Sequence, residues 1–238
     1  MKNFQKTVIA SSLLCVTAAA VAADKSPVTA NVALTSDYVW RGISQSAEEF
    51  ALQGGFDYAH NSGFYMGLWG SNVDFEDQTV DGAQLETDIY AGYGFKAGGV
   101  DLDVGVLHYA YPGAAGALDY DWTEVYFGGS FGMFSAKFSY TDDFTGPLDE
   151  SAYYLEAGLN LDLGQGYGLG LHVGKSDGDW FDVVGADYVD YKISLSKEFG
   201  GFGFDLSYTD TDLDGANAIK SGAFANDGRL VLTVSKSM

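Results

Sequence analysis

The sequence predicts an all-β protein: a transmembrane, antiparallel, up-and-down β-barrel of about twelve strands. Apolar and polar residues alternate with period two along most of the chain after residue 27, which is the pattern of strands with one apolar face. The connections between these segments are short and long by turns, as in a series of hairpins. Glycine (32), tyrosine (16) and phenylalanine (16) are abundant and proline (3) is rare, a composition that favours strands and turns.

Composition also excludes three classes of protein. The chain has 33 acidic residues against 12 basic ones, a net charge of −21, so it would repel the phosphates of a nucleic acid. Aromatic residues make up 15% of the chain, too many for a disordered protein. Beyond residue 23, no apolar run approaches the roughly 18–20 residues that a membrane-spanning helix needs.

Residues 1–23 have the features of a secretory signal peptide, which leaves residues 24–238 as one barrel domain. Two lysines precede an apolar run, and Val21 and Ala23 are the small residues expected before a cleavage site. The alternative is a buried N-terminal helix, which is less favoured because the rest of the chain has almost no helical periodicity. The only cysteine, Cys15, lies in this segment, so the exported chain would fold without disulfides.

The first alternating segment defines the two faces of the predicted barrel. Its apolar face comprises Val28, Ala30, Val32, Leu34, Tyr38 and Trp40, and its polar face Thr29, Asn31, Thr35, Asp37 and Arg41. Later segments alternate in the same way, and most are long enough to cross a bilayer when tilted. The strands are expected near 28–41, 51–60, 64–73, 83–96, 99–109, 121–130, 132–141, 151–163, 166–175, 187–199, 202–210 and 228–238.

The connections indicate which end of the barrel is which. Short turns join the strands at one end, and acidic loops join them at the other. An even strand number puts both chain ends on the short-turn side, which would be periplasmic. The long loops are expected at 42–50, 74–82, 110–120, 142–150, 176–186 and 211–227.

A soluble β-sandwich would also alternate, but two features favour a membrane barrel. The face opposite the apolar one is strongly charged, which a wet lumen accommodates and a soluble core does not. Aromatic residues on the apolar face gather at both strand ends, as expected for two girdles at the lipid headgroups. These residues are Tyr38, Trp40, Tyr140, Tyr153, Tyr191 and Tyr208 at one rim, and Tyr58, Tyr93, Phe95, Phe131, Tyr167, Phe199 and Phe202 at the other.

Four blocks of sequence carry a resemblance to a known family. They read SDYVWRGISQS at 36–46, GFYMGLWGSN at 63–72, ETDIYAGY at 86–93 and YAYPG at 109–113. With these blocks the chain resembles the TorF family of porins over essentially its whole length after the signal peptide. The resemblance implies an outer-membrane barrel of proteobacterial type, hence of a Gram-negative bacterium, and a porin-like role. It brings no catalytic residues that could be transferred to this chain.

A barrel of this kind would have outer-membrane lipid and lipopolysaccharide as neighbours. It would be inserted by the barrel-assembly machinery, which reads an aromatic residue at the end of most such chains. Here the last residue is Met238, on the outward phase of its strand. Assembly is expected either to be less efficient or to tolerate methionine.

The strand phases place an excess of acidic side chains in the lumen. We expect a narrow zone of mixed charge above an acidic ring near the periplasmic ends of the strands, and a field that concentrates cations and rejects anions. The pore-lining residues of the narrow zone are expected to be Arg41, Glu86, Asp88, Glu124, Glu156, Asp190, Lys192 and Arg229. The ring is expected to comprise Asp57, Asp101, Asp103, Asp162 and Asp205.

The sequence therefore favours a channel for passive diffusion of small hydrophilic solutes, with cations preferred. In the alternative, side chains plug the narrow lumen, because twelve strands enclose little space. The barrel could then serve as a structural or adhesive anchor through its loops.

A membrane-embedded hydrolase is a further alternative, but no catalytic constellation stands out. Of the three histidines only His172 points inward, and neither a Ser–His pair nor a metal-ligand spacing accompanies it. We therefore expect no cofactor and no resident metal. One open question is the loop with Asp210, Asp212 and Asp214, which resembles the start of a calcium loop but lacks the closing glutamate.

Overall fold

The computed structural model describes residues 27–75 and 82–238. The predicted signal peptide, residues 1–23, and part of the acidic loop expected at 74–82 lie outside the described residues. None of the helices in the described part is both long and apolar enough to span a membrane.

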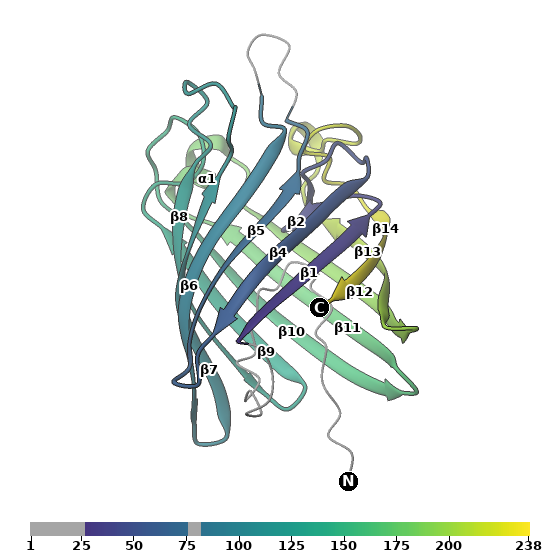
Figure 1. Cartoon of the computed structure of the whole chain (residues 1–238). Coiled ribbons are helices and arrows are strands. Elements are labelled where there is room, and N and C mark those ends of the chain that lie inside the picture. Colours follow the sequence, from purple (N-terminus) through teal and green to yellow (C-terminus); the bar gives the residue numbers. More distant parts are fainter. Residues whose placement is uncertain (1–26, 76–81) are drawn as a thin grey trace.

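Twelve of the described strands close into one antiparallel barrel, as predicted (Figure 1). Neighbours in sequence are neighbours in the sheet, and the last strand pairs with the first. The barrel strands are β1 (Val28–Thr35), β4 (Ala51–Ala59), β5 (Phe64–Asn72), β6 (Leu85–Ala97), β7 (Val100–Ala110), β8 (Trp122–Phe131), β9 (Phe134–Thr141), β10 (Ala152–Gly164), β11 (Tyr167–Asp177), β12 (Tyr188–Phe199), β13 (Phe202–Thr211) and β14 (Arg229–Ser237). The remaining elements are β2 (Val39–Trp40), β3 (Ile43–Ser44), α1 (Asp179–Val184) and the 3-10 helix η1 (Gly215–Asn217).

The period-two pattern fixes which side chains face outward. On β10, for example, Leu155 is 54% exposed whereas the next residue, Glu156, is 3% exposed. The same alternation of exposed apolar and covered polar residues runs along the other strands. A soluble sandwich would cover the apolar face instead, so the closed barrel rules that alternative out.

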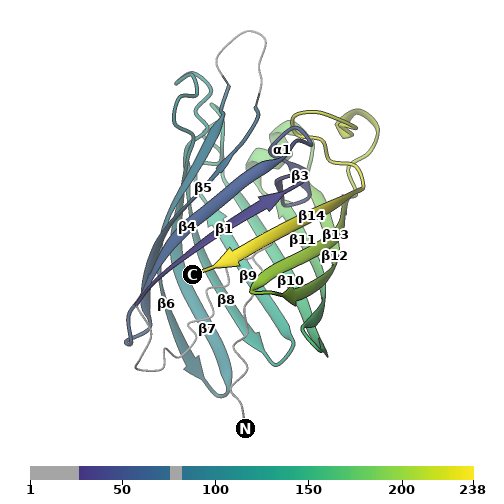
Figure 2. The ribbon, with the colours of Figure 1, turned by 45° about the vertical axis from the view of Figure 1, so that its right-hand side comes forward.

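Short turns join the strands at one end of the barrel and longer connections at the other (Figure 1). The chain ends at the short-turn end of β14, beside the start of β1 (Figure 2). The seam between them runs from Asn31 opposite Ser237 to Thr35 opposite Thr233. Met238 extends the seam by exchanging backbone hydrogen bonds with Ala30, and its side chain is exposed.

The first strand corrects the sequence prediction, because it ends at Thr35 rather than at residue 41. The chain then turns into the lumen and forms the small β2–β3 hairpin (residues 36–50, called the inward hairpin below). Arg41 and Gly42 have positive φ values of 47° and 80°, and this pair reverses the chain. Tyr38 and Trp40 therefore lie inside the barrel. The prediction that places them in the outer aromatic girdle is wrong.

The other predicted girdle aromatics lie on the outward face. Nine of them are at least 40% exposed: Tyr93, Phe95, Phe131, Tyr140, Tyr167, Tyr191, Phe199, Phe202 and Tyr208. Tyr58 and Tyr153 are half-exposed. The outer surface thus keeps an apolar band with aromatic residues at both ends.

Inside the barrel, bulky aromatic rings lie against glycines of the adjacent strand. A Cβ added to any of these glycines would come within 2.4 Å of a tyrosine side chain, too close for real atoms. The rings can therefore lie along the wall instead of filling the centre. The pairs are Tyr65 with Gly92, Tyr90 with Gly67, Tyr126 with Gly105 and Tyr154 with Gly174.

Candidate functional site

The inward hairpin is built around the carboxylate of Asp37. Its Oδ1 accepts hydrogen bonds from the hydroxyls of Ser44 (2.7 Å) and Ser46 (3.0 Å), and the Ser46 hydroxyl accepts one from the backbone N–H of Tyr38 (2.9 Å). Its Oδ2 lies 3.3 Å from Nη1 of Arg229 on β14. One side chain thus closes the hairpin on itself and ties its base to the wall.

At the tip of the hairpin, Arg41 reaches across the lumen to the opposite wall. Its Nη2 donates to both carboxylate oxygens of Glu124 on β8, at 2.7 and 2.8 Å. The guanidinium also lies 4.1 Å from the ring centroid of Trp40 and 4.2 Å from that of Tyr154. Both charged groups are buried, so this paired and ring-covered contact compensates two charges that water does not reach.

A pair of carboxylates on β6 faces the hairpin next to this contact. Tyr38 donates its hydroxyl to Oε1 of Glu86 (2.8 Å), and Tyr111 also hydrogen bonds Glu86. Burial, followed by the negative charges of Glu86 and Asp88, raises the pKa of Tyr38 and of Tyr111 well above the usual tyrosine value, so both hydroxyls stay protonated. Within the described residues, neither Glu86 nor Asp88 forms an ion pair with a lysine or arginine.

A second polar network crosses β9 to β12. Lys137 Nζ lies 2.9 Å from Oε1 of Glu156, and His172 Nε2 lies 3.0 Å from Oδ1 of Asp190. The Tyr154 hydroxyl donates to Oδ2 of Asp190 (2.8 Å), so one tyrosine joins this network to Arg41. The neighbours of His172 are two carboxylates and a phenol, and in the described part of the chain no serine hydroxyl bonds to it.

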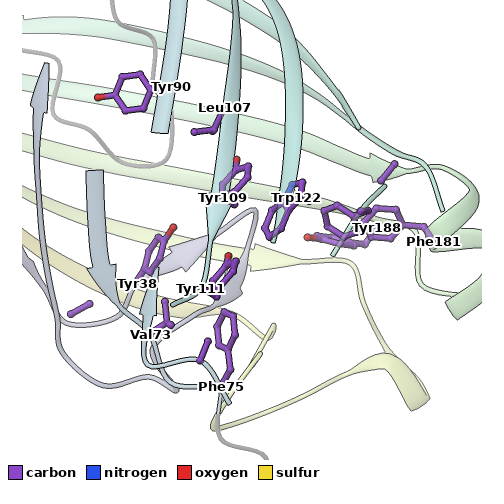
Figure 3. Close-up of a cluster of buried hydrophobic side chains, with 14 of the residues drawn as sticks. Tyr38, Val73, Phe75, Tyr90, Leu107, Tyr109, Tyr111, Trp122, Phe181 and Tyr188 are labelled. Atoms are coloured by element: carbon purple, nitrogen blue, oxygen red, sulfur yellow. The ribbon is translucent and has the colours of Figure 1, made fainter. Parts of the chain in front are cut away.

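An aromatic cluster fills the lumen at the long-loop end. Trp122 stacks on Tyr109 with ring centroids 4.1 Å apart and meets Trp40 of the hairpin edge-on at 5.9 Å. Figure 3 shows this cluster with Tyr38 and Tyr111 beside it, and with Phe181 of α1 and Tyr188 at its far end. Aromatic side chains from the wall, the hairpin and α1 therefore pack together at this level.

The eight residues expected to line the narrow zone all have inward side chains, but they do not act as one group. Arg41 pairs with Glu124, while Arg229 pairs with Asp37 at the base of the hairpin. Lys192 is electrostatically coupled to Asp205 and Asp190. Arg41 arrives from the hairpin rather than from a strand.

The five acids expected to form a periplasmic ring have separate partners. Asp57 accepts a hydrogen bond from Tyr90 and Asp103 accepts one from Tyr65, while Asp205 lies near Lys192. The two others lie beside short turns: Asp101 pairs with Lys96, and Asp162 accepts from the backbone N–H of Gly164. In the segment that resembles the start of a calcium loop, Asp210 accepts a hydrogen bond from the Tyr208 hydroxyl. Asp212 accepts one from the backbone N–H of Val189.

The structure adds residues that the pattern did not single out. Asp37, Tyr38, Lys137, Tyr154 and His172 all belong to the two networks. The one sequence signal that could have revealed the inward hairpin is the Arg41–Gly42 pair, since a glycine between two short apolar segments often marks a turn.

Residues 19–238 match the model of a family described as "Bacterial protein of unknown function (Gcw_chp)". No functionally curated protein shows significant similarity to the sequence. Among solved structures, a KdgM porin is similar with a TM-score of 0.57 at 11% identity, covering 88% of this chain and 99% of that one. A NanC porin gives 0.57 at 8% identity, covering 87% and 97%. A KdgM porin in complex with disordered oligogalacturonate gives 0.53 at 10% identity, covering 89% and 98%. At these identities the likeness establishes a shared fold.

Proposed function

Because the chain belongs to the Gcw_chp family of bacterial proteins, for which no function is known, we propose a function from the barrel itself. It is an outer-membrane channel for the passive diffusion of small hydrophilic solutes, with cations preferred over anions. It is not an enzyme and needs no cofactor. Its neighbours are outer-membrane lipid and lipopolysaccharide, and the barrel-assembly machinery inserts it after export through the signal peptide.

The observation that carries this proposal is the distribution of apolar and polar side chains, which is the reverse of that in a soluble protein. The outside of the closed barrel is an exposed apolar band with aromatic residues at both ends, and the inside is polar and charged. Water would not tolerate so large an apolar surface, whereas lipid does. The fold shared with KdgM and NanC porins and the resemblance to the TorF family support a channel.

The preference for cations follows from the charge of the wall. Carboxylates outnumber cationic side chains on the inward phase of the described strands. Screening in physiological salt acts over roughly 8 Å, so an acidic wall is felt across a narrow lumen. Cations are thereby concentrated in the lumen and anions are excluded.

In the conformation described, the inward carboxylates near the long-loop end are covered. Glu86, Asp88, Glu124, Glu156 and Asp190 are all no more than 3% exposed. Solute that passes this level must displace the inward hairpin or the rings packed on it. The hairpin is therefore the element whose movement would widen the lumen.

Liposome swelling tests the proposal. Full-length protein is reconstituted, and the swelling rate is compared for cationic, neutral and anionic solutes of matched size. Swelling should exceed that of protein-free liposomes, with cationic solutes fastest and anionic ones slowest. No swelling above the protein-free rate would contradict a channel, and faster entry of anions would contradict the selectivity.

A further inference from the structure

We propose that the wall around Glu124 is a binding site for solutes that carry a guanidinium group, and that Arg41 occupies this site as an internal ligand. A solute guanidinium that takes the place of Arg41 would release the inward hairpin and open the lumen. The inference rests on the proposed channel function and adds the chemical class of the solute that opens it.

The receiving side of the contact belongs to the barrel wall. Glu124 lies on β8 and Tyr154 on β10, and Tyr109 of β7 places its hydroxyl 3.4 Å from Oε2 of Glu124. Glu124 holds one guanidinium nitrogen, Nη2, between its two oxygens, and the Tyr154 ring lies 4.2 Å from the guanidinium carbon, an arrangement that suits a flat and delocalised cation. Sodium and other spherical ions lack the flat face that stacks on these rings.

The cation that fills this site comes from the turn after the first, two-residue strand of a short hairpin, whose second strand is held by backbone hydrogen bonds of Ser44 with Phe224 and Ala225. The inward hairpin contains two strands of two residues each, and Arg41, Ala47 and Glu48 have positive φ values that L-residues rarely adopt. Contacts made by the tip hold this backbone in place more than local preference does. The ion pair of Asp37 with Arg229 lies at the base, so the tip can leave while the base stays attached.

Withdrawal of the tip would leave a net negative charge on the buried wall. Glu124 would lose its cationic partner, and Glu86 beside it forms no ion pair with a lysine or arginine among the described residues. Asp88 lies close enough to both carboxylates to interact with them electrostatically. A carboxylate that has lost its cationic partner favours a cation from solution in its place, so a cation that binds Glu124 stabilises the open state. Opening of the lumen and binding of a cation are therefore linked through Glu86, Asp88 and Glu124.

The test uses full-length protein in planar bilayers, with guanidinium chloride at low millimolar concentration as the probe and sodium chloride as the reference. Guanidinium should raise the conductance of the wild type several-fold, and sodium at equal concentration should not. Arg41→Ala should conduct without guanidinium and should favour guanidinium over sodium several-fold in reversal potentials. In the Arg41→Ala/Glu124→Gln double variant, this preference should fall to that expected from ion mobility alone.

Lys175→Ala is the matched control, since it removes an exposed positive charge near the same end of the barrel. It should respond to guanidinium as the wild type does. Folding of each variant is checked by heat-dependent migration on a gel. If Arg41→Ala conducts but does not distinguish the two ions, and the wild type ignores guanidinium, the guanidinium site is refuted and the channel stands. If every protein is silent in both salts, the channel proposal fails, and the guanidinium site with it.

Discussion

Arg229 on the last strand reaches Asp37 at the base of the inward hairpin, with 3.3 Å between Nη1 and Oδ2. The two residues are 192 positions apart, so this ion pair joins the last barrel strand to the segment that follows the first. Asp37 also organises the two serines of the hairpin. The ion pair thus links the strand that closes the barrel, β14, to the hairpin that lies in the lumen.

Arg229→Ala should loosen the base of the hairpin without disrupting the barrel. The buried carboxylate of Asp37 loses its cationic partner, which favours hairpin conformations that expose it to water. The mean conductance in planar bilayers should rise several-fold. Lys236→Ala is the control, because it removes a positive charge from the outward face of the same strand. Equal conductance of both variants would argue against this anchor.

Gly42→Ala should prevent the tip of the hairpin from seating. An added Cβ would lie 2.5 Å from Cγ2 of Thr211 and 2.8 Å from Cβ of Asp190, at a φ of +80° that disfavours alanine. The channel should stay open more of the time, as measured by single-channel recording. Gly113→Ala is a matched control, with a φ of +92° and nothing within 4 Å of the added Cβ. Similar gating of the two variants would show that backbone strain alone, rather than the fit against the wall, is responsible.

Gly67→Ala should destabilise the barrel wall. Its Cβ would lie 2.3 Å from the ring of Tyr90, so the ring must leave its place along the wall. Overpacking of this kind lowers the free energy of unfolding by about 1–3 kcal/mol. Urea unfolding in detergent or lipid measures the change. In a Tyr90→Ala background the same substitution should have almost no effect, and equal losses in both backgrounds would disprove the ring–glycine contact.

Asp57→Asn combined with Asp103→Asn should weaken cation preference. Both acids face the lumen, and each accepts a hydrogen bond from a tyrosine that asparagine can still accept. The reversal potential across a potassium chloride gradient should shift toward zero as the field of the wall decreases. Asp142→Asn with Asp143→Asn removes the same charge from an exposed loop and should shift it less. A larger shift from the loop variant would place the selective charges outside the barrel.

Local alternation was enough to predict the barrel but not the hairpin inside it. From Val28 to Thr35 the period-two pattern places residues correctly, since each side chain meets either the outside or the lumen. Tyr38 and Trp40 continue the same pattern, and yet they lie inside. Their position depends on partners 48 and 83 residues ahead, the carboxylates that bind Tyr38 and Arg41, and no local period reports such contacts.

For the candidate site as well, local alternation predicts which side chains face inward but not which of them contact one another. Strand phase identified Glu86, Glu124 and Asp190 as inward residues, because phase depends only on neighbours in sequence. Which acid meets which base depends on strand register and on loops that enter the lumen. The period-two pattern of β9 puts Lys137 on the inward face, but its pairing with Glu156 follows only from the register of β9 against β10.

The inward hairpin also constrains the order of assembly. Three of its anchoring contacts join residues 48, 83 and 192 positions apart, so these partners come together only after most of the wall has formed. An early intermediate would therefore be an unobstructed cylinder, and seating of Arg41 would be a late step. A newly inserted molecule would leak briefly before it seals.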